Sequence, residues 1–162
     1  MDSNKEHNTA GKKDSYMEIP SLALFPHKME AQLRFNDIDI LGHLNNTVYF
    51  SLYDMGKARF LEASGLRRKG DSRPDTVIAD IHCTYMKPIH FDDSIFVATR
   101  CSHIGEKSYV LEQMLVDDKG EVYSICRTVM VHLDAETGLP APLTDEHIAL
   151  IKRYDAEHTQ KK

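Results

Sequence analysis

The stretch RFNDIDILGHLNNTVY, residues 34–49, decides how this chain of 162 residues begins to fold. Before and into it, apolar and polar residues alternate over residues 29–35, a period of two that predicts a strand. Gly42 and two asparagines then indicate a tight turn. Asn45 or Asn46 can cap a helix, because its side-chain oxygen accepts a hydrogen bond from a first-turn amide. The stretch therefore predicts a strand, a turn and the start of a helix.

The predicted helix covers residues 46–64. Gly65 follows it and is suited to end a helix in the left-handed conformation. Gly56 weakens an isolated helix by about 1 kcal/mol relative to alanine, so we expect it to allow a close approach to a sheet. The apolar residues recur every three or four positions and form one stripe, consisting of Tyr49, Leu52, Tyr53, Gly56, Phe60 and Ala63.

Four strand-like segments follow without another long helix between them: residues 76–86, 94–102, 108–117 and 121–133. Pro88 stops ladder pairing after the first of them. The short turns that join the last three, HIGEK at 103–107 and DDKG at 117–120, imply antiparallel hairpins. A final helix is predicted from Thr144. This order predicts an α+β domain of two layers, in which one long helix covers an antiparallel sheet of about five strands. One helix covers little of such a sheet, so we expect a partner chain to cover the remaining face and edges.

The length favours one domain, which we place at residues 25–156. Residues 1–24 are expected to form a disordered or extended tail, and residues 157–162 a second tail. The first tail lacks the apolar segment of a secretory signal and carries several acidic residues, unlike a transit peptide.

Composition excludes several classes of protein. The formal net charge is -5, with 20 Lys and Arg against 25 Asp and Glu, which argues against nucleic-acid binding. No apolar run approaches the roughly 20 residues that span a bilayer. The three cysteines are odd in number and form no C-x-x-C motif, which argues against a disulfide framework. A reducing compartment, and hence a cytoplasmic location, is expected.

Groups able to do chemistry gather just before the helix. Asp37, Asp39 and His43 lie close to a helix N-terminus, whose unpaired amides can stabilise an oxyanion. A carboxylate can activate water as a general base or attack as a nucleophile. These groups suit acyl transfer to water. Each also has an ordinary structural role, because an aspartate before a helix typically forms a turn or a cap.

Other site types do not match the sequence. The Asp37-x-Asp39 pair with Gly42 superficially resembles a calcium loop, but Leu41 and Val48 stand where that loop needs oxygen ligands. The nine histidines form no H-E-x-x-H motif, and no Cys/His spacing suits zinc. Neither a G-x-S-x-G motif nor a phosphate-binding glycine-rich loop is present. We therefore expect no metal site.

The opening stretch resembles the signature of the hotdog-fold acyl-CoA thioesterases of the 4-hydroxybenzoyl-CoA thioesterase type. The similarity extends over most of residues 29–140, including a Tyr-x-x-Pro-Ile match from Tyr85 to Ile89 and a hairpin match at residues 104–108. It implies a hotdog fold, in which an antiparallel sheet wraps around one long helix. The positions that match the signature are Phe35, Asp37, Asp39, Gly42, His43, Asn45, Asn46 and Tyr49.

The resemblance also implies roles for individual residues. Asp39 matches the catalytic carboxylate of the family, and Asn46 matches the position whose backbone amide polarises the thioester carbonyl. His43 matches a catalytic histidine of the related plant acyl-carrier-protein thioesterases. Those enzymes place an asparagine where this sequence has Leu41, and 4-hydroxybenzoyl-CoA thioesterase lacks the histidine. The implied reaction is hydrolysis of an acyl-CoA or acyl-carrier-protein thioester, with no cofactor other than the coenzyme A of the substrate.

Hotdog thioesterases bind coenzyme A at a subunit interface and the acyl chain between helix and sheet. The resemblance therefore implies a homodimer, or a tetramer, in which Tyr49, Leu52, Tyr53 and residues of the strand 76–86 line the acyl channel. Lys107 and Ser108, in the hairpin match, are implied contacts for coenzyme A. The tyrosines also fit an ordinary core, and the lysine a solvated surface.

Two other functions remain open on the same fold. One is a non-catalytic module that binds acyl-CoA, because a fold does not determine a function. The other is a hotdog dehydratase, which pairs a histidine with a carboxylate on the long helix. His43 precedes the helix and Glu62 lies at its far end, so the sequence favours the hydrolase.

Overall fold

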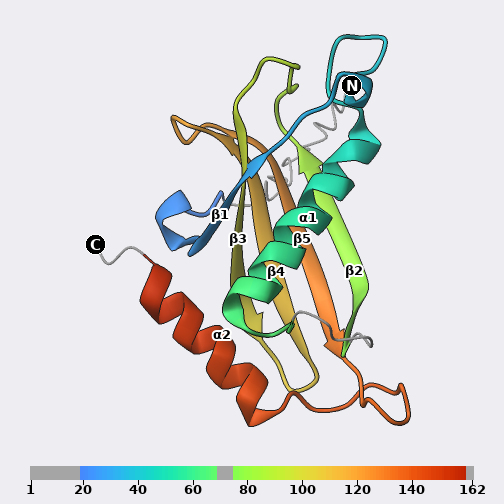
Figure 1. Ribbon diagram of the computed structural model, residues 1–162, viewed down its shortest axis with the longest axis vertical. Coiled ribbons are helices and arrows are strands. Elements are labelled where there is room, and N and C mark those ends of the chain that lie inside the picture. Colours follow the sequence, from blue (N-terminus) through green and yellow to red (C-terminus); the bar gives the residue numbers. More distant parts are fainter. Residues whose placement is uncertain (1–18, 69–74, 160–162) are drawn as a thin grey trace, which may run out of the picture.

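The computed structural model describes residues 19–68 and 75–159. It has two layers, with helix α1 lying across one face of a five-stranded sheet (Figure 1). No helix within these residues is long and apolar enough to cross a membrane. The elements in chain order are η1 (Leu22–Leu24), β1 (His27–Ala31), η2 (Phe35–Asp37), α1 (Asn46–Ser64), β2 (Thr76–Tyr85), β3 (Ile95–Ile104), β4 (Ser108–Asp117), β5 (Val122–His132) and α2 (Asp145–His158).

The sheet has the strand order β1-β3-β4-β5-β2, and every neighbouring pair is antiparallel. The predicted hairpins β3–β4 and β4–β5 are confirmed. After β1 the chain runs through α1 to the opposite edge of the sheet, where β2 pairs with β5. The α+β prediction, a long helix on an antiparallel sheet of five strands, is therefore confirmed.

The first strand ends earlier than its sequence pattern predicts. We expected residues 29–35, whereas β1 ends at Ala31 and the short 3-10 helix η2 begins at Phe35. The Asp37 carboxylate accepts a hydrogen bond from the Arg34 backbone N–H at 2.8 Å. Such a local bond between side chain and backbone turns the chain out of the sheet, although the alternation of apolar residues continues.

Helix α1 has the predicted bounds because both of its ends are capped. The Asn45 side chain accepts from the Thr47 N–H at 3.0 Å, and Gly65 ends the helix in the left-handed conformation with φ 81°. One member of the predicted stripe is wrong: Ala63 is exposed, and the neighbouring Ser64 is buried instead. The remaining stripe residues are buried as predicted, namely Tyr49, Leu52, Tyr53, Gly56 and Phe60.

Gly56 marks the closest approach of α1 to the sheet. A Cβ atom at this position would lie 2.4 Å from Cγ1 of Val97 and 3.0 Å from Nε2 of Gln113. Gln113 is buried and donates to the Tyr53 carbonyl at 2.9 Å and to Oγ1 of Thr99 at 3.1 Å. The helix and the sheet are therefore in direct contact at this point and joined by a satisfied polar contact.

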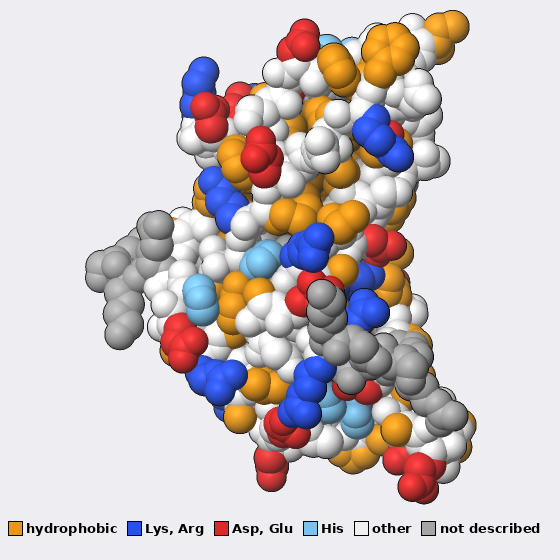
Figure 2. Space-filling model, in the orientation of Figure 1, with side chains coloured by type: hydrophobic (Ala, Val, Ile, Leu, Met, Phe, Trp, Pro, Cys, Tyr) orange, Lys and Arg blue, Asp and Glu red, His pale blue; other side chains and the backbone are white. Residues whose placement is uncertain are grey.

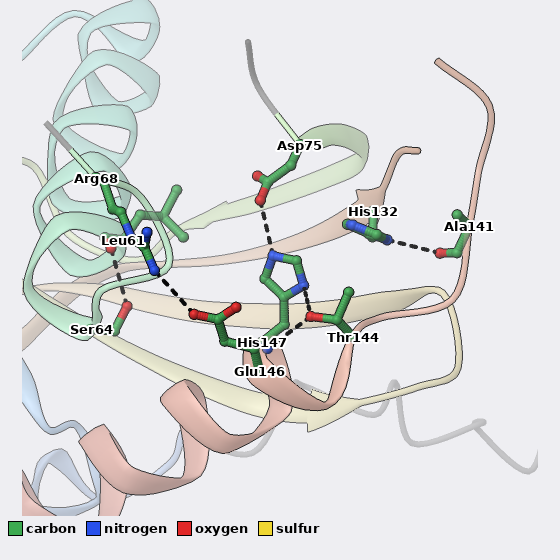
Figure 3. Close-up of polar contacts among 9 residues, drawn as sticks. All are labelled: Leu61, Ser64, Arg68, Asp75, His132, Ala141, Thr144, Glu146 and His147. Atoms are coloured by element: carbon green, nitrogen blue, oxygen red, sulfur yellow. Dashed lines mark hydrogen bonds and ion pairs between the residues drawn. The ribbon is translucent and has the colours of Figure 1, made fainter. Parts of the chain in front are cut away.

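Helix α2 is anchored at its N-terminus by polar contacts, shown in Figure 3. Thr144 caps the helix by accepting from the His147 N–H at 3.2 Å. Nε2 of His147 lies 2.9 Å from Oδ2 of Asp75, just before β2, and Arg68 pairs with Glu146 at 3.1 Å. These bonds tie α2 to the end of the sheet at which β2 begins.

The predicted tails fit the structure only in part. Residues 22–24, which we placed in the first tail, form η1, and Leu22 packs with Phe25 against apolar residues of the sheet. Helix α2 continues to His158, two residues beyond the predicted limit of 156. Residues 1–18 and 160–162 lie outside the described residues.

We predict that Gly56→Ala destabilises the protein by about 1–3 kcal/mol, because Val97 has a stiff branched side chain and cannot yield to the added methyl group. Urea or thermal unfolding measures this loss. Ser51→Ala, on the exposed side of α1, is the matched control and should change stability by less than about 0.5 kcal/mol. A Gly56→Ala protein as stable as the wild type would contradict the close contact.

Candidate active site

A cleft of about 370 Å³ lies at the N-terminal end of α1. Three segments form it: the loop before α1, the first turns of α1, and the end of β2 with the residues that follow. Four of the residues expected at the site line this cleft together. The lining residues are Asp39, His43, Leu44, Asn46, Tyr49, Tyr85, Met86, Lys87 and Pro88.

Backbone hydrogen bonds hold the loop before α1. The Asp39 N–H donates to the His43 carbonyl at 2.8 Å, which closes the turn. Gly42 lies within that turn at φ 79°, a conformation that favours glycine. The Leu44 N–H donates to the Ile89 carbonyl at 2.7 Å and joins the loop to the segment after β2. Backbone hydrogen bonds therefore fix the conformation of the loop that carries Asp39 and His43.

The Asp39 carboxylate is oriented by this turn. Its Oδ1 accepts from the Leu41 N–H at 2.8 Å and from the His43 N–H at 3.4 Å. Within residues 19–68 and 75–159, no donor is hydrogen-bonded to Oδ2. One oxygen is therefore fixed by the backbone, and the other is available to water or a ligand.

Asp37 serves the turn rather than the cleft. It is buried and pairs with the Arg34 guanidinium at 2.9 Å. The hydrogen bonds from Arg34 hold the pKa of the Asp37 carboxyl below its usual range. The Asp37 carbonyl accepts from the Asn45 N–H at 2.8 Å, so this residue also positions the helix cap.

The first residue of α1 offers a backbone N–H for hydrogen bonding to a ligand. In the part of the chain that the structure describes, the Asn46 N–H has no hydrogen-bond acceptor. First-turn amides carry the positive end of the helix dipole, so this N–H can bind a carbonyl oxygen that gains negative charge. Asp39 and Asn46 thus contribute a carboxylate and a donor to the same cleft.

Two tyrosines form the aromatic wall of the cleft. Tyr49 and Tyr85 meet edge to face with ring centroids 4.8 Å apart. The Tyr85 hydroxyl donates to the Asn46 carbonyl at 3.1 Å, which ties the end of β2 to the helix start. Burial raises the pKa of Tyr49 to about 12, so its hydroxyl is neutral at physiological pH. Tyr85 was not singled out as a site residue, although it lies in the predicted strand 76–86, whose residues were expected to line the acyl channel, and begins the Tyr-x-x-Pro-Ile match.

A histidine and a lysine add polar groups to the cleft. The His43 ring packs edge to face against His90, with centroids 5.2 Å apart. Lys87 pairs with Glu121, the residue before β5, and this hydrogen bond raises the pKa of Lys87.

The described residues contain no cluster of three or more His, Cys, Asp or Glu that could hold a metal ion.

Three expected binding residues lie away from the cleft in the single chain. Tyr53 is 1% exposed and belongs to the core, one helical turn beyond Tyr49. Lys107 and Ser108 lie at the β3–β4 hairpin, at the end of the sheet opposite the α1 N-terminus (Figure 1). The residues of the signature at 35–49 are neighbours in the sequence and can therefore meet in one chain. Lys107 and Ser108 can reach a cleft only if another copy of the chain brings their hairpin to it.

Exposed apolar side chains lie in the loop before α1 and in the segment after β2, which also supply residues of the cleft. Ile40 is fully exposed, and Phe35 is 81% exposed and packs edge to face against Phe91. Figure 2 shows hydrophobic side chains gathered at this end of the molecule. Such a patch is typical of a binding surface.

The comparison with protein families gives one clear match. The model of the thioesterase-like superfamily matches residues 33–151, which include the whole cleft and most of the sheet. The uncharacterized protein YsmA of Bacillus subtilis is 23% identical over 117 residues, covering 72% of this chain and 79% of YsmA.

Solved structures show the same fold. A thioesterase from Thermus thermophilus, in complex with coenzyme A and zinc, has 28% sequence identity and a TM-score of 0.72. The match covers 82% of this chain and 97% of that one. A mutant of 4-hydroxybenzoyl-CoA thioesterase complexed with 4-hydroxybenzoyl-CoA has 16% identity and a TM-score of 0.68, with 77% and 97% covered. The chain belongs to the thioesterase-like superfamily and has the hotdog fold of these thioesterases.

Proposed function

We propose that this protein hydrolyses acyl thioesters, with acyl-CoA as the substrate, to a free acid and a thiol. The observation that carries the proposal is that one cleft holds both the Asp39 carboxylate, whose Oδ2 has no hydrogen-bond donor among the described residues, and the Asn46 N–H, which has no acceptor among them. The similarity to a thioesterase complexed with coenzyme A supports it. The reaction uses water and needs no cofactor, and we place it in the cytoplasm because the sequence favours a reducing compartment.

In the proposed reaction, the Asn46 N–H stabilises negative charge on the carbonyl oxygen, and the Asp39 carboxylate acts on water or on the carbonyl carbon. The thioester carbonyl accepts from the Asn46 N–H, whose helix dipole stabilises the oxyanion that develops. On the other side, Asp39 activates water as a general base or attacks the carbonyl carbon directly. His43, in the same turn as Asp39, orients the reacting groups or transfers the proton. Tyr49 and Tyr85 contact the acyl group, and the thiol of coenzyme A leaves.

Asp39→Asn keeps the size of the side chain and its contacts with the Leu41 and His43 amides, but it removes the base. We expect kcat for acyl-CoA hydrolysis, followed by release of free thiol, to fall by a factor of about 10²–10⁴. Binding of acyl-CoA, measured by calorimetry, should persist. Asp92→Asn, an exposed aspartate outside the cleft, is the control. Undiminished hydrolysis in Asp39→Asn, or binding without turnover in the wild type, would contradict the proposal.

Asn46→Pro tests the amide donor by itself. Proline is favoured at the first position of a helix, and Asn45, at ψ 135°, already has the extended conformation that proline requires of the residue before it. The substitution therefore removes the N–H while leaving the helix start intact. We expect kcat to fall about 10²–10³-fold. Asn46→Ala retains the N–H and should retain activity, so equal activity of the two variants would rule out the oxyanion role.

We further propose that the active form is a homodimer paired along β2. This strand of ten residues lies at an edge of the sheet, and its outer side has no strand neighbour in the described residues. A long apolar edge is a template for pairing with another chain. Its exposed apolar residues are Val77, Ile78, Ile81 and Tyr85.

Antiparallel pairing of two β2 strands would also complete the site. Val77 pairs with Val131 and Val131 with Ser108, so the hairpin bearing Lys107 lies near the Val77 end of β2. The cleft lies at the Tyr85 end. Because the second strand runs in the reverse direction, its hairpin end comes to this chain's cleft end. Lys107 and Ser108 of a second copy are thus our proposed contacts for coenzyme A.

Ile81→Lys places two like charges near the centre of the proposed β2 pairing. We expect light scattering to show a dimer for the wild type and a monomer for Ile81→Lys, with loss of thioester hydrolysis in the monomer. Leu139→Lys, an exposed apolar residue in the loop after β5, is the control and should remain dimeric. A fully active wild-type monomer would overturn the dimer while leaving the hydrolysis proposal intact.

A further inference from the structure

Two cysteines face each other across strands β2 and β5. Cys83 pairs directly with Cys126, in a register that is unbroken from Asp80 to Tyr85. Opposite residues of an antiparallel pair have Cα atoms about 4.5–5.5 Å apart, and disulfides need about 4.4–6.8 Å. The backbone is therefore already placed for a disulfide.

The two thiols have different surroundings. Contact with the Cys126 thiol is the main cause that lowers the pKa of Cys83, and Ser124, whose Oγ lies 3.4 Å from the Cys83 sulfur, acts in the same direction. The same contact, together with burial, raises the pKa of Cys126. Cys83 is half-buried, whereas Cys126 is fully buried. Cys83 is thus the more accessible and the more acidic thiol of the pair, and Cys126 is the less acidic thiol buried behind it.

The third cysteine provides an internal comparison. Cys101 lies on β3 opposite Leu111, so no cysteine faces it in the sheet register. Its thiol donates to the His103 carbonyl at 3.4 Å, and burial raises its pKa to about 12. The protein therefore combines one facing pair of cysteines with one thiol of raised pKa that has no cysteine opposite it.

We propose that Cys83 and Cys126 form a redox-active pair, which a hydroperoxide oxidises to a disulfide joining β2 to β5. The Cys83 thiolate attacks one oxygen of hydrogen peroxide, the O–O bond breaks, and with one proton water leaves and a sulfenic acid remains. The Cys126 sulfur then attacks the Cys83 sulfur, and the hydroxyl departs with the Cys126 proton as water. Two thiols and one peroxide give one disulfide and two waters.

This bond would act on the strand that forms the cleft wall. Cys83 lies two residues before Tyr85, so both side chains point to the same face of β2. Tyr85 contacts Tyr49 and the helix start. Oxidation therefore fixes the end of β2 that carries Tyr85. The pair itself does not depend on the proposed hydrolysis.

The test treats the reduced full chain with a small excess of hydrogen peroxide, followed by intact mass spectrometry and peptide mapping. We expect the mass to fall by that of two hydrogen atoms, with Cys83 linked to Cys126 and only Cys101 open to alkylation. Dithiothreitol should restore the starting mass. The oxidised form should melt about 5 °C or more above the reduced form.

Cysteine variants show which thiol reacts in each step of the oxidation. Cys101→Ser is the matched control and should oxidise like the wild type, whereas Cys83→Ser should form no disulfide. Cys126→Ala should accumulate a sulfenic acid on Cys83 that dimedone traps. The proposal is overturned if the wild type gains oxygen on Cys83 with Cys126 still free, if Cys101 enters the disulfide, or if the bond joins two chains. The wild-type result is decisive even if a variant does not fold.

Discussion

The missing side chain at Gly56 lets α1 lie directly on β3 and β4. Any larger residue would meet Val97 and Gln113 at less than ordinary contact distance. Around this point the buried Gln113 joins the helix carbonyl of Tyr53 to the sheet. The position of α1 on the sheet follows from this contact, and so does the place at which its N-terminus emerges. A glycine that weakens the isolated helix is thus used to bring two layers together.

The position of the helix decides what the preceding loop can do. At the helix start, the Asn46 N–H has no acceptor among the residues that the structure describes, while the turn amides of Leu41 and His43 hold the Asp39 carboxylate of the same cleft. Both groups are pre-organised by backbone bonds rather than by flexible side chains, which reduces the reorganisation needed when charge develops. The Arg34–Asp37 pair does not line the cleft, but the Asp37 carbonyl accepts from the Asn45 N–H and so positions the helix cap beside it.

Strand β2 links the cleft to the rest of the molecule. Its end carries Tyr85 at the cleft wall, its middle carries Cys83 opposite Cys126, and its outer edge is apolar and exposed. An edge strand has hydrogen-bonded neighbours on one side only, so it moves and pairs more readily than a central strand. Assembly, oxidation and substrate contact would therefore act on the same ten residues.

The sequence by itself determined the helix 46–64, the order of helices and strands along the chain, and the local group of Asp39, His43 and Asn46, because caps, periodicity and short-range turns are properties of neighbouring residues. Only the tertiary structure decided the rest. It placed Tyr85 beside Tyr49, Cys83 opposite Cys126, and Tyr53 in the core. These contacts join residues far apart in the chain, and their geometry depends on strand register and on how closely the helix meets the sheet, which no local pattern encodes.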